Sequence, residues 1–218
     1  DNNDYIYKNI AQDRTGLRFE IIHNQVTYPI FSPMIGLYMV ENICGAFAMA
    51  SELNVPPEKI IAAIAKFTGI KRRLENRGTT PSGATVYDDI AHSPTKAKSV
   101  LATLKQIYTG KIYAIFEPNS GNRQTEAVPL YNDAFKDADK VIIPRLTKIK
   151  IKEGEEEKVM EGSKLKDVIA QTHSNTVYIE NDEELINHLK QKTTAEDAIV
   201  FLGSHGFRGM IDRVIESP

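Results

Sequence analysis

The sequence predicts an α/β protein in which a Rossmann-like, doubly wound and mostly parallel sheet follows a small α+β remnant of another domain. After Gly69, short apolar segments rich in β-branched residues alternate with helical segments. This alternation is typical of a parallel sheet with helices on both faces. Before Gly69 the order is hairpin, helix, helix. Two helices need more sheet than one hairpin supplies, so we expect this part to belong to a larger domain.

In the first part, apolar and polar residues alternate over Leu17–Ile22 and Val26–Ile30, which predicts a β-hairpin. The apolar segment Met34–Leu53, rich in small residues, predicts a buried helix. Pro56-Pro57-Glu58 predicts the start of a second helix, which ends at Phe67.

In the second part, five strands are predicted: Thr85–Asp89, Ile112–Phe116, Lys140–Pro144, Thr176–Ile179 and Ala198–Leu202. Four helices lie between them, and a short one follows Gly209: Thr95–Tyr108, Glu126–Lys136, Ser163–Gln171 and Asp182–Lys192. The charged segment 145–162 is predicted to be a solvated loop or an edge hairpin. We place the domains at residues 1–70 and 71–218.

Composition narrows the function classes. The chain has 218 residues and a net charge of −2, so nucleic acid is not an expected partner. No apolar segment is long enough to span a membrane, and no signal peptide opens the chain. The single cysteine, Cys44, cannot form an internal disulfide, which favours a cytoplasmic location. The start at Asp1, without an initiator Met, suggests a fragment of a longer protein.

Polar groups follow the predicted strands where their carboxyl ends meet, which is where open α/β sheets bind ligands. Successive strand residues point to opposite faces, so only one of Asp88 and Asp89 can face a given ligand. One could bind ribose or a metal shell while the other caps the loop, or both could be solvated turn acids. The remaining strand-end groups are His92, Glu117, Asn119, Ser120, Arg123, Arg145, Glu180, Asn181, Asp182, Ser204 and His205.

Two interpretations are open for a group of cations at the domain junction and for His92. The cations Lys71-Arg72-Arg73 could contact phosphate or a nucleotide base, or could simply pair with Glu75. His92 is either a functional group or an exposed loop histidine, and Thr95 could cap the helix that follows it. Ser204-His205 is not predicted to be a catalytic pair, because no nucleophile elbow surrounds it. The five histidines show no metal-ligand spacing, so no metal site is predicted.

Three segments, in order, resemble the Mur ligase family, the ATP-dependent amide ligases of peptidoglycan synthesis. They are Gly36–Asn42, Lys71–Glu75 and Asp88–Thr95, which are similar to the end of the family's central ATPase domain, its domain junction and the start of its C-terminal domain. Residues 116–120 and 203–207 resemble the branch that joins UDP-N-acetylmuramate to L-alanyl-γ-D-glutamyl-meso-diaminopimelate.

The resemblance implies a reaction that uses ATP and Mg²⁺ and passes through an acyl phosphate of the muramoyl carboxylate. It implies ATP contacts for Asn42, Arg73, Asp88 and Asp89. It implies acceptor contacts for Glu117, Asn119, Ser120, Arg123, Ser204 and His205, and it places His92, the candidate catalytic residue, near the reacting amine or ATP. No phosphate-binding Gly-x-x-x-x-Gly-Lys-Ser/Thr loop occurs in the chain.

In the family that loop, the metal ligands and the UDP-sugar domain lie upstream. We therefore expect residues 1–70 to end the central ATPase domain, residues 71–218 to be the C-terminal domain, and the chain to be inactive alone. Its partners would be UDP-N-acetylmuramate, the peptide acceptor and upstream domains of the same polypeptide.

Two alternatives remain. One is another ligase of the same fold, such as a UDP-N-acetylmuramate–L-alanine ligase or a relative of the folylpolyglutamate or cyanophycin synthetases. The other is a non-catalytic nucleotide- or peptide-binding module. The amine substrate that is accepted would distinguish the ligases, and ligand binding by an Asp89→Ala variant would separate nucleotide from peptide roles.

Overall fold

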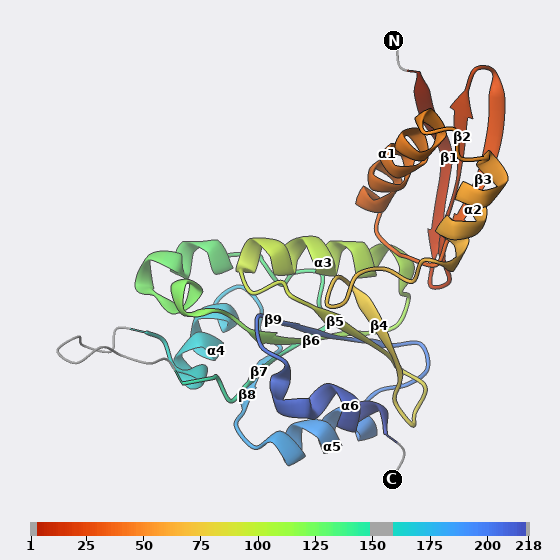
Figure 1. Ribbon diagram of the computed structural model, residues 1–218. Coiled ribbons are helices and arrows are strands. Elements are labelled where there is room, and N and C mark those ends of the chain that lie inside the picture. The colour runs from red at the N-terminus through yellow and green to blue at the C-terminus, as the bar shows by residue number, and fades with distance from the viewer. Residues whose placement is uncertain (1–3, 149–158, 217–218) are drawn as a thin grey trace. The chain divides into compact units, whose positions relative to one another are not determined.

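The chain divides into two compact units, residues 1–70 and 71–218 (Figure 1). The computed structural model describes residues 4–148 and 159–216. Each unit is described by itself.

The first unit is a three-stranded antiparallel sheet covered on one face by two helices. The strands lie in the order β1 (Tyr5–Asp13), β2 (Gly16–His23) and β3 (Val26–Ser32), and the helices are α1 (Tyr38–Glu52) and α2 (Pro57–Lys66). The predicted hairpin and both predicted helices are confirmed, but α1 is not the buried helix that the sequence predicts, because only one face of it is buried. Asn24 and Gln25 turn the hairpin with positive φ angles of 49° and 65°, as a two-residue turn between twisted strands requires.

Strand β1 was not predicted, because its residues are mostly exposed and a bulge between Lys8 and Ala11 interrupts its register with β2. A half-buried strand is predicted from strict alternation, and a bulge removes that alternation. The core of the unit lies between the sheet and the helices and is formed by Leu17, Phe19, Ile21, Ile30, Val40, Ile43, Cys44, Phe47 and Ile60.

The second unit is built on a six-stranded sheet in the order β4-β5-β9-β6-β7-β8. The strands are β4 (Glu75–Thr79), β5 (Thr85–Asp89), β6 (Ile112–Glu117), β7 (Lys140–Pro144), β8 (Thr176–Ile179) and β9 (Ala198–Gly203). Strand β4 runs antiparallel to β5, and the other pairs are parallel. The five predicted strands and the parallel, doubly wound sheet are confirmed.

Helices cover both faces of this sheet. They are α3 (Pro94–Ile107), α4 (Gly162–Ala170), α5 (Asp182–Lys192) and α6 (Met210–Ile215), together with the short 3₁₀ helices η1 (Ser120–Arg123), η2 (Thr125–Tyr131) and η3 (Phe207–Gly209). Figure 1 shows α3 on one face and α5 and α6 on the other. On the second face Ile115, Ile199 and Phe201 pack with Leu189 and Met210. Their neighbours along the strands face the other way, so both faces of the sheet are apolar.

Two sequence predictions in this unit were incomplete. The segment Glu126–Lys136 is not an α-helix: η2 ends at Tyr131 and contains Pro129, which has no N–H to donate to a helical hydrogen bond. Strand β4 was missed because it is short and polar, as edge strands often are. Within the charged segment 145–162, residues 149–158 lie outside the described residues.

The strand order places the carboxyl ends of β5, β9 and β6 next to one another. Strand β9, the last along the chain, lies between β5 and β6. The chain therefore runs outward from β6 to β7 and β8 and then returns to the middle of the sheet. The carboxyl ends of β5, β9 and β6 are therefore adjacent, which is the usual place for a ligand crevice in such sheets. No helix in the described ranges combines the length and the apolar character needed to cross a bilayer.

Candidate ligand site at the carboxyl edge of the sheet

Glu117 is the buried acid at this edge. It is the last residue of β6, and 1% of its surface is exposed. Its Oε1 atom accepts hydrogen bonds from the Thr147 backbone N–H (2.8 Å) and the Thr147 hydroxyl (2.6 Å). Its Oε2 atom is buried and accepts no hydrogen bond from the described residues. A buried carboxylate oxygen without a hydrogen-bond donor is costly, and the charge nearest to it is that of Arg208.

Arg208 lies beside Glu117, on the loop that follows β9. Its Nη1 atom is 3.8 Å from Glu117 Oε2. Its Nε and Nη2 atoms donate to the two carboxylate oxygens of Asp182, at 2.9 and 2.8 Å. The hydrogen bond from Arg208 lowers the pKa of Asp182, and the same bond raises the pKa of Arg208. The pair fixes the plane of the guanidinium group in the manner of a bidentate ion pair.

The backbone around Arg208 is strained. Phe207 and Arg208 have positive φ angles of 49° and 54°, a conformation that costs about 1–3 kcal/mol for residues other than glycine. The buried ring of Phe207 packs edge-on against Phe201, 5.1 Å between centroids. Packing of this kind can hold the strained conformation, and strained residues of this kind cluster at functional sites.

Gly203 allows β9 to approach β6 closely. A Cβ atom on Gly203 would lie 2.9 Å from the carbonyl oxygen of Glu117 and 2.8 Å from Cζ of Phe207. A side chain at this position would therefore displace the end of β6, and only glycine fits.

The Ser204-His205 segment is positioned by Arg72. The Arg72 guanidinium donates to three successive carbonyl oxygens, those of Gly203, Ser204 (3.0 Å) and His205 (3.1 Å). The Ser204 hydroxyl is 3.2 Å from Nδ1 of His205, and that ring nitrogen lies 4.0 Å from Glu117 Oε1. The His205 side chain is 54% exposed, so this ring is accessible from solvent.

Asp88 and Asp89 are both buried, so they are not the solvated turn acids that one interpretation of the sequence held. Asp89 accepts hydrogen bonds from the backbone N–H groups of Leu74 (2.7 Å) and Ala91 (2.8 Å), so it caps the loops around β5. The Oδ1 atom of Asp88 lies 3.5 Å from Arg72 Nε, and its Oδ2 atom lies 3.5 Å from Arg77 Nη1. Burial raises the pKa of both carboxyl groups.

The candidate catalytic residue His92 is partly buried, and its Nδ1 atom is 2.8 Å from the carbonyl oxygen of Ile90. The carbonyl of His92 accepts from the Asn119 N–H at 3.4 Å, so the loops after β5 and β6 are in contact. Asn119 caps η1 through the Asn122 N–H at 3.1 Å, and Ser120 is exposed. The cap of α3 is Ser93, not Thr95, because the hydroxyl of Ser93 accepts from the Lys96 N–H.

Arg123 lies apart from these groups. It is 2% exposed, and its three donor nitrogens bond to the carbonyls of Met160 and Thr147 and to the carboxylate of Glu161, at 2.9, 2.9 and 3.0 Å. All its nitrogens are engaged within the protein, so the geometry favours a role in holding Thr147, and through it Glu117, over direct contact with an acceptor.

Two of the nucleotide candidates are exposed. Arg73 is exposed. Burial raises the pKa of Asp89, and the charge of Arg73 offsets only part of that rise. Asn42 belongs to the first unit, is exposed on α1, and its amide lies 3.7 Å from the sulfur of Met39.

Sequence reasoning missed Thr147 and Arg208 as parts of this edge, and it singled out Arg72 without its bonds to the carbonyls of Gly203, Ser204 and His205. Arg208 had a usable signal, since it follows the last strand within a glycine-flanked loop. Thr147 had none, because its role depends on a hydrogen bond to a residue 30 positions earlier.

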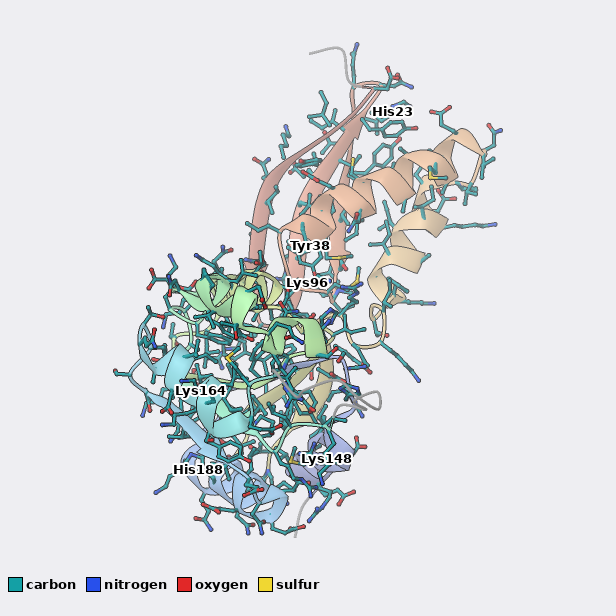
Figure 2. The ribbon with its side chains drawn as sticks, turned by 90° about the vertical axis from the view of Figure 1, so that its left-hand side faces the viewer. His23, Tyr38, Lys96, Lys148, Lys164 and His188 are labelled. Atoms are coloured by element: carbon teal, nitrogen blue, oxygen red, sulfur yellow. The ribbon has the colours of Figure 1, made fainter. Side chains whose placement is uncertain are left out.

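A charged cavity continues the edge past Arg208. It has a volume of about 470 Å³ and is lined by Arg145, Glu180, Asn181, Asp182 and Glu183. Arg145 donates to Asp182 at 3.1 Å. Lys148 follows the carboxyl end of β7, and Figure 2 shows it apart from His188. Burial and the charges of Lys140 and Lys192 lower the pKa of His188. Lys140 is the first residue of β7, so His188 belongs to the opposite edge of the sheet.

The fold and this edge are those of a doubly wound α/β domain with its ligand crevice at the carboxyl ends of the strands. Residues 72–205 match the family model described as "Mur ligase, glutamate ligase domain". The chain belongs to the Mur ligase family.

Relatives named UDP-N-acetylmuramate–L-alanine ligase are similar to this chain. That of Methylorubrum extorquens is 31% identical over 198 residues, which cover 89% of this chain and 40% of the relative. That of Caldicellulosiruptor bescii is 43% identical over 108 residues, which cover 50% of this chain and 24% of the relative. The chain spans less than half the length of these relatives.

Solved structures show the same fold. The UDP-N-acetylmuramate–alanine ligase of Thermotoga maritima matches 97% of this chain and 45% of its own, with a TM-score of 0.75 and 20% identity. A murein peptide ligase of Psychrobacter arcticus matches 98% of this chain and 44% of its own, with a TM-score of 0.58 and 26% identity.

Proposed function

We propose that this chain is the acceptor-binding part of an ATP-dependent ligase that joins UDP-N-acetylmuramate to L-alanine. The curated relatives that support this proposal carry that name, and one of them matches 89% of the chain. Among the interpretations of the sequence, this was an alternative to the tripeptide-joining branch, and the relatives support it better.

The single observation that carries the proposal is the pair Glu117 and Arg208 at the carboxyl edge. Glu117 Oε2 is buried without a hydrogen-bond donor, and a fixed guanidinium group stands 3.8 Å away. This edge can bind and orient the amine-bearing substrate. In the proposal, residues 71–218 hold the acceptor and residues 1–70 end the central ATPase domain of the full polypeptide.

ATP and Mg²⁺ do not fit the residues described here. Among the described residues, no three His, Cys, Asp or Glu side chains are grouped closely enough to hold a metal ion. The candidate acids Asp88 and Asp89 already accept from cations and backbone amides, and the sequence contains no phosphate-binding loop. We propose acceptor binding as the contribution of this chain, and the nucleotide contacts of Asn42 and Arg73 are proposals of the same standing.

A second candidate is the ligase that joins UDP-N-acetylmuramate to L-alanyl-γ-D-glutamyl-meso-diaminopimelate. The observation that favours it is the Glu117-Pro118-Asn119-Ser120 segment, which resembles that branch and supplies a buried carboxylate at the acceptor edge. Such a carboxylate suits an acceptor with a second ammonium group. The murein peptide ligase match, at 26% identity, agrees with this candidate.

The test is phosphate release from ATP by the full-length polypeptide that contains this chain. With UDP-N-acetylmuramate and L-alanine present, we expect release that stops when either is omitted. Release with the tripeptide but not with L-alanine would replace the proposal with the second candidate. Release with neither acceptor would refute both. Residues 1–218 alone are the control, and we expect no amide formation from them.

A further inference from the structure

Asp88 is the buried half of an ion pair with Arg72, beside the loop that follows β9. We propose that Asp88 is a positioning residue: it orients the Arg72 guanidinium group, which in turn fixes the conformation of residues 203–205. The inference rests on the proposed function, since this segment carries two candidate acceptor contacts, Ser204 and His205. It replaces the ATP contact that the sequence resemblance implies for Asp88.

Both oxygens of Asp88 face arginine side chains. Asp88 lies in β5 and is 2% exposed. Its Oδ1 atom is next to Arg72 Nε and its Oδ2 atom is next to Arg77 Nη1. A ribose hydroxyl would have to displace one of these cations from a buried carboxylate, and a buried charge is costly unless it is paired. The surroundings of Asp88 therefore favour pairing within the protein over contact with a nucleotide.

Each nitrogen of the Arg72 guanidinium group has a partner. Nε faces Asp88 Oδ1 at 3.5 Å. Nη1 donates to the carbonyl oxygen of Ser204 at 3.0 Å, and Nη2 donates to those of Gly203 and His205. The group is planar, so a partner at Nε also sets the directions of the two Nη atoms. Asp88 therefore determines how Arg72 presents its donors to the loop.

The backbone of Arg72 is itself fixed. Arg72 and Leu74 have positive φ angles of 59° and 46°, and strained residues of this kind persist where surrounding contacts hold them. The Arg72 N–H donates to Glu75 Oε2 at 2.8 Å, and its carbonyl oxygen accepts from the Ile90 N–H at 2.9 Å. The Arg72 side chain thus extends from an anchored point to a loop that lies 132 residues later in the chain.

The loop needs this support for its conformation and not for the stability of the core. Ser204 is partly exposed, and His205 and Gly206 are exposed. No atom lies within 4 Å of a Cβ added to Gly206. Water can replace Arg72 at exposed carbonyl oxygens at little cost in free energy. We therefore expect loss of Arg72 or Asp88 to leave the core folded and to release the loop.

The first experiment measures NMR order parameters of the backbone amides of residues 204–206 in the chain 1–218. We expect values near 0.85, typical of rigid backbone, in the wild type and below about 0.6 in Asp88→Asn and in Arg72→Gln. The double variant should match Arg72→Gln, because Asp88 acts through Arg72 and the two effects are then not additive. Unchanged order parameters in Asp88→Asn, or additive effects in the double variant, would overturn the proposal.

Asp212→Asn is the matched control. Asp212 also pairs with Arg77, at 2.6 Å, but its side chain is 63% exposed. Its replacement should leave the loop order parameters unchanged, and an effect equal to that of Asp88→Asn would show that general weakening of the charge network, and not the orientation of Arg72, moves the loop. Loss of the folded spectrum in both Asp88→Asn and Arg72→Gln would also overturn the proposal, since the pair would then serve folding.

The second experiment separates positioning from a nucleotide contact in the full-length polypeptide that contains this chain. Asp88→Asn should raise the KM for the acceptor about tenfold and change the KM for ATP by less than about twofold. The reverse split would restore the ATP contact and refute the inference. If the wild-type polypeptide releases no phosphate with either acceptor, the proposed function fails, and the order parameters still decide the inference.

Discussion

Replacing Asp89 with alanine separates a structural role from a nucleotide-binding role. Each oxygen of Asp89 accepts from one backbone N–H, that of Leu74 at 2.7 Å or that of Ala91 at 2.8 Å. Leu74 and Ala91 are buried, so water cannot readily replace the lost acceptor. Leaving a buried donor unpaired costs about 1–3 kcal/mol, and the two together cost about 2–6 kcal/mol.

Part of this cost is offset, because the variant no longer buries a carboxyl group whose pKa burial raises. We therefore expect Asp89→Ala to lower the free energy of unfolding of residues 71–218 by about 2–4 kcal/mol. Asp89→Asn keeps one acceptor oxygen and should cost about half as much.

The assay is amide hydrogen exchange by NMR, which reports on Leu74 and Ala91 directly. Their exchange should become about 30-fold to 1000-fold faster in Asp89→Ala, since each 1.4 kcal/mol is a factor of ten. Asp167→Ala is the control: its carboxylate is exposed on α4 and pairs with Lys166, so its loss should change stability by less than about 0.5 kcal/mol. Unchanged exchange in Asp89→Ala together with weaker ATP binding by the full-length protein would refute the structural role and support the ribose contact that the sequence resemblance implies.

Two further predictions concern the same edge of the sheet. Gly203→Ala should lower the free energy of unfolding by about 1–3 kcal/mol, because its Cβ would lie 2.9 Å from the carbonyl oxygen of Glu117. The thermal midpoint measures this loss. Gly206→Ala is the control, since no atom lies within 4 Å of the new Cβ, and equal effects of the two substitutions would contradict the close approach. Asp182 has a pKa held below its ordinary value of 3.8 by its bond to Arg208, so its stabilising effect is present above pH 3.8 and is lost as pH falls through the lowered value. The difference in urea midpoint between wild type and Asp182→Asn should therefore shrink on acidification, and a difference that grows would contradict the ion pair.

Much of the fold could be predicted from local patterns. The strands β5 to β9 are short runs of apolar and β-branched residues between helical segments, and their positions follow from periodicity alone. The failures have local causes: the bulge in β1 and the polar composition of β4 remove the alternation that marks a strand, and Pro129 prevents an α-helix where composition favours one.

The sequence predicted which polar residues lie at this edge of the sheet, but not the contacts that they make. Collecting the polar residues at strand ends identified Glu117, Ser204 and His205 as neighbours of one crevice, because parallel strands bring their carboxyl ends to one edge. The same reasoning also made Arg123 a candidate ligand contact. In the structure, all three nitrogens of its guanidinium group donate hydrogen bonds within the protein.

The sequence by itself determined the family, the alternation of strands and helices, and the edge at which polar groups collect. The tertiary structure alone decided which of those groups are engaged in hydrogen bonds within the protein and which are not. Asp89 is capped by nearby amides, whereas one oxygen of Glu117 is left without a donor. The physical reason is that hydrogen-bond partners at this edge come from distant parts of the chain: Thr147 lies 30 residues from Glu117, and Ser204 lies 132 residues from Arg72.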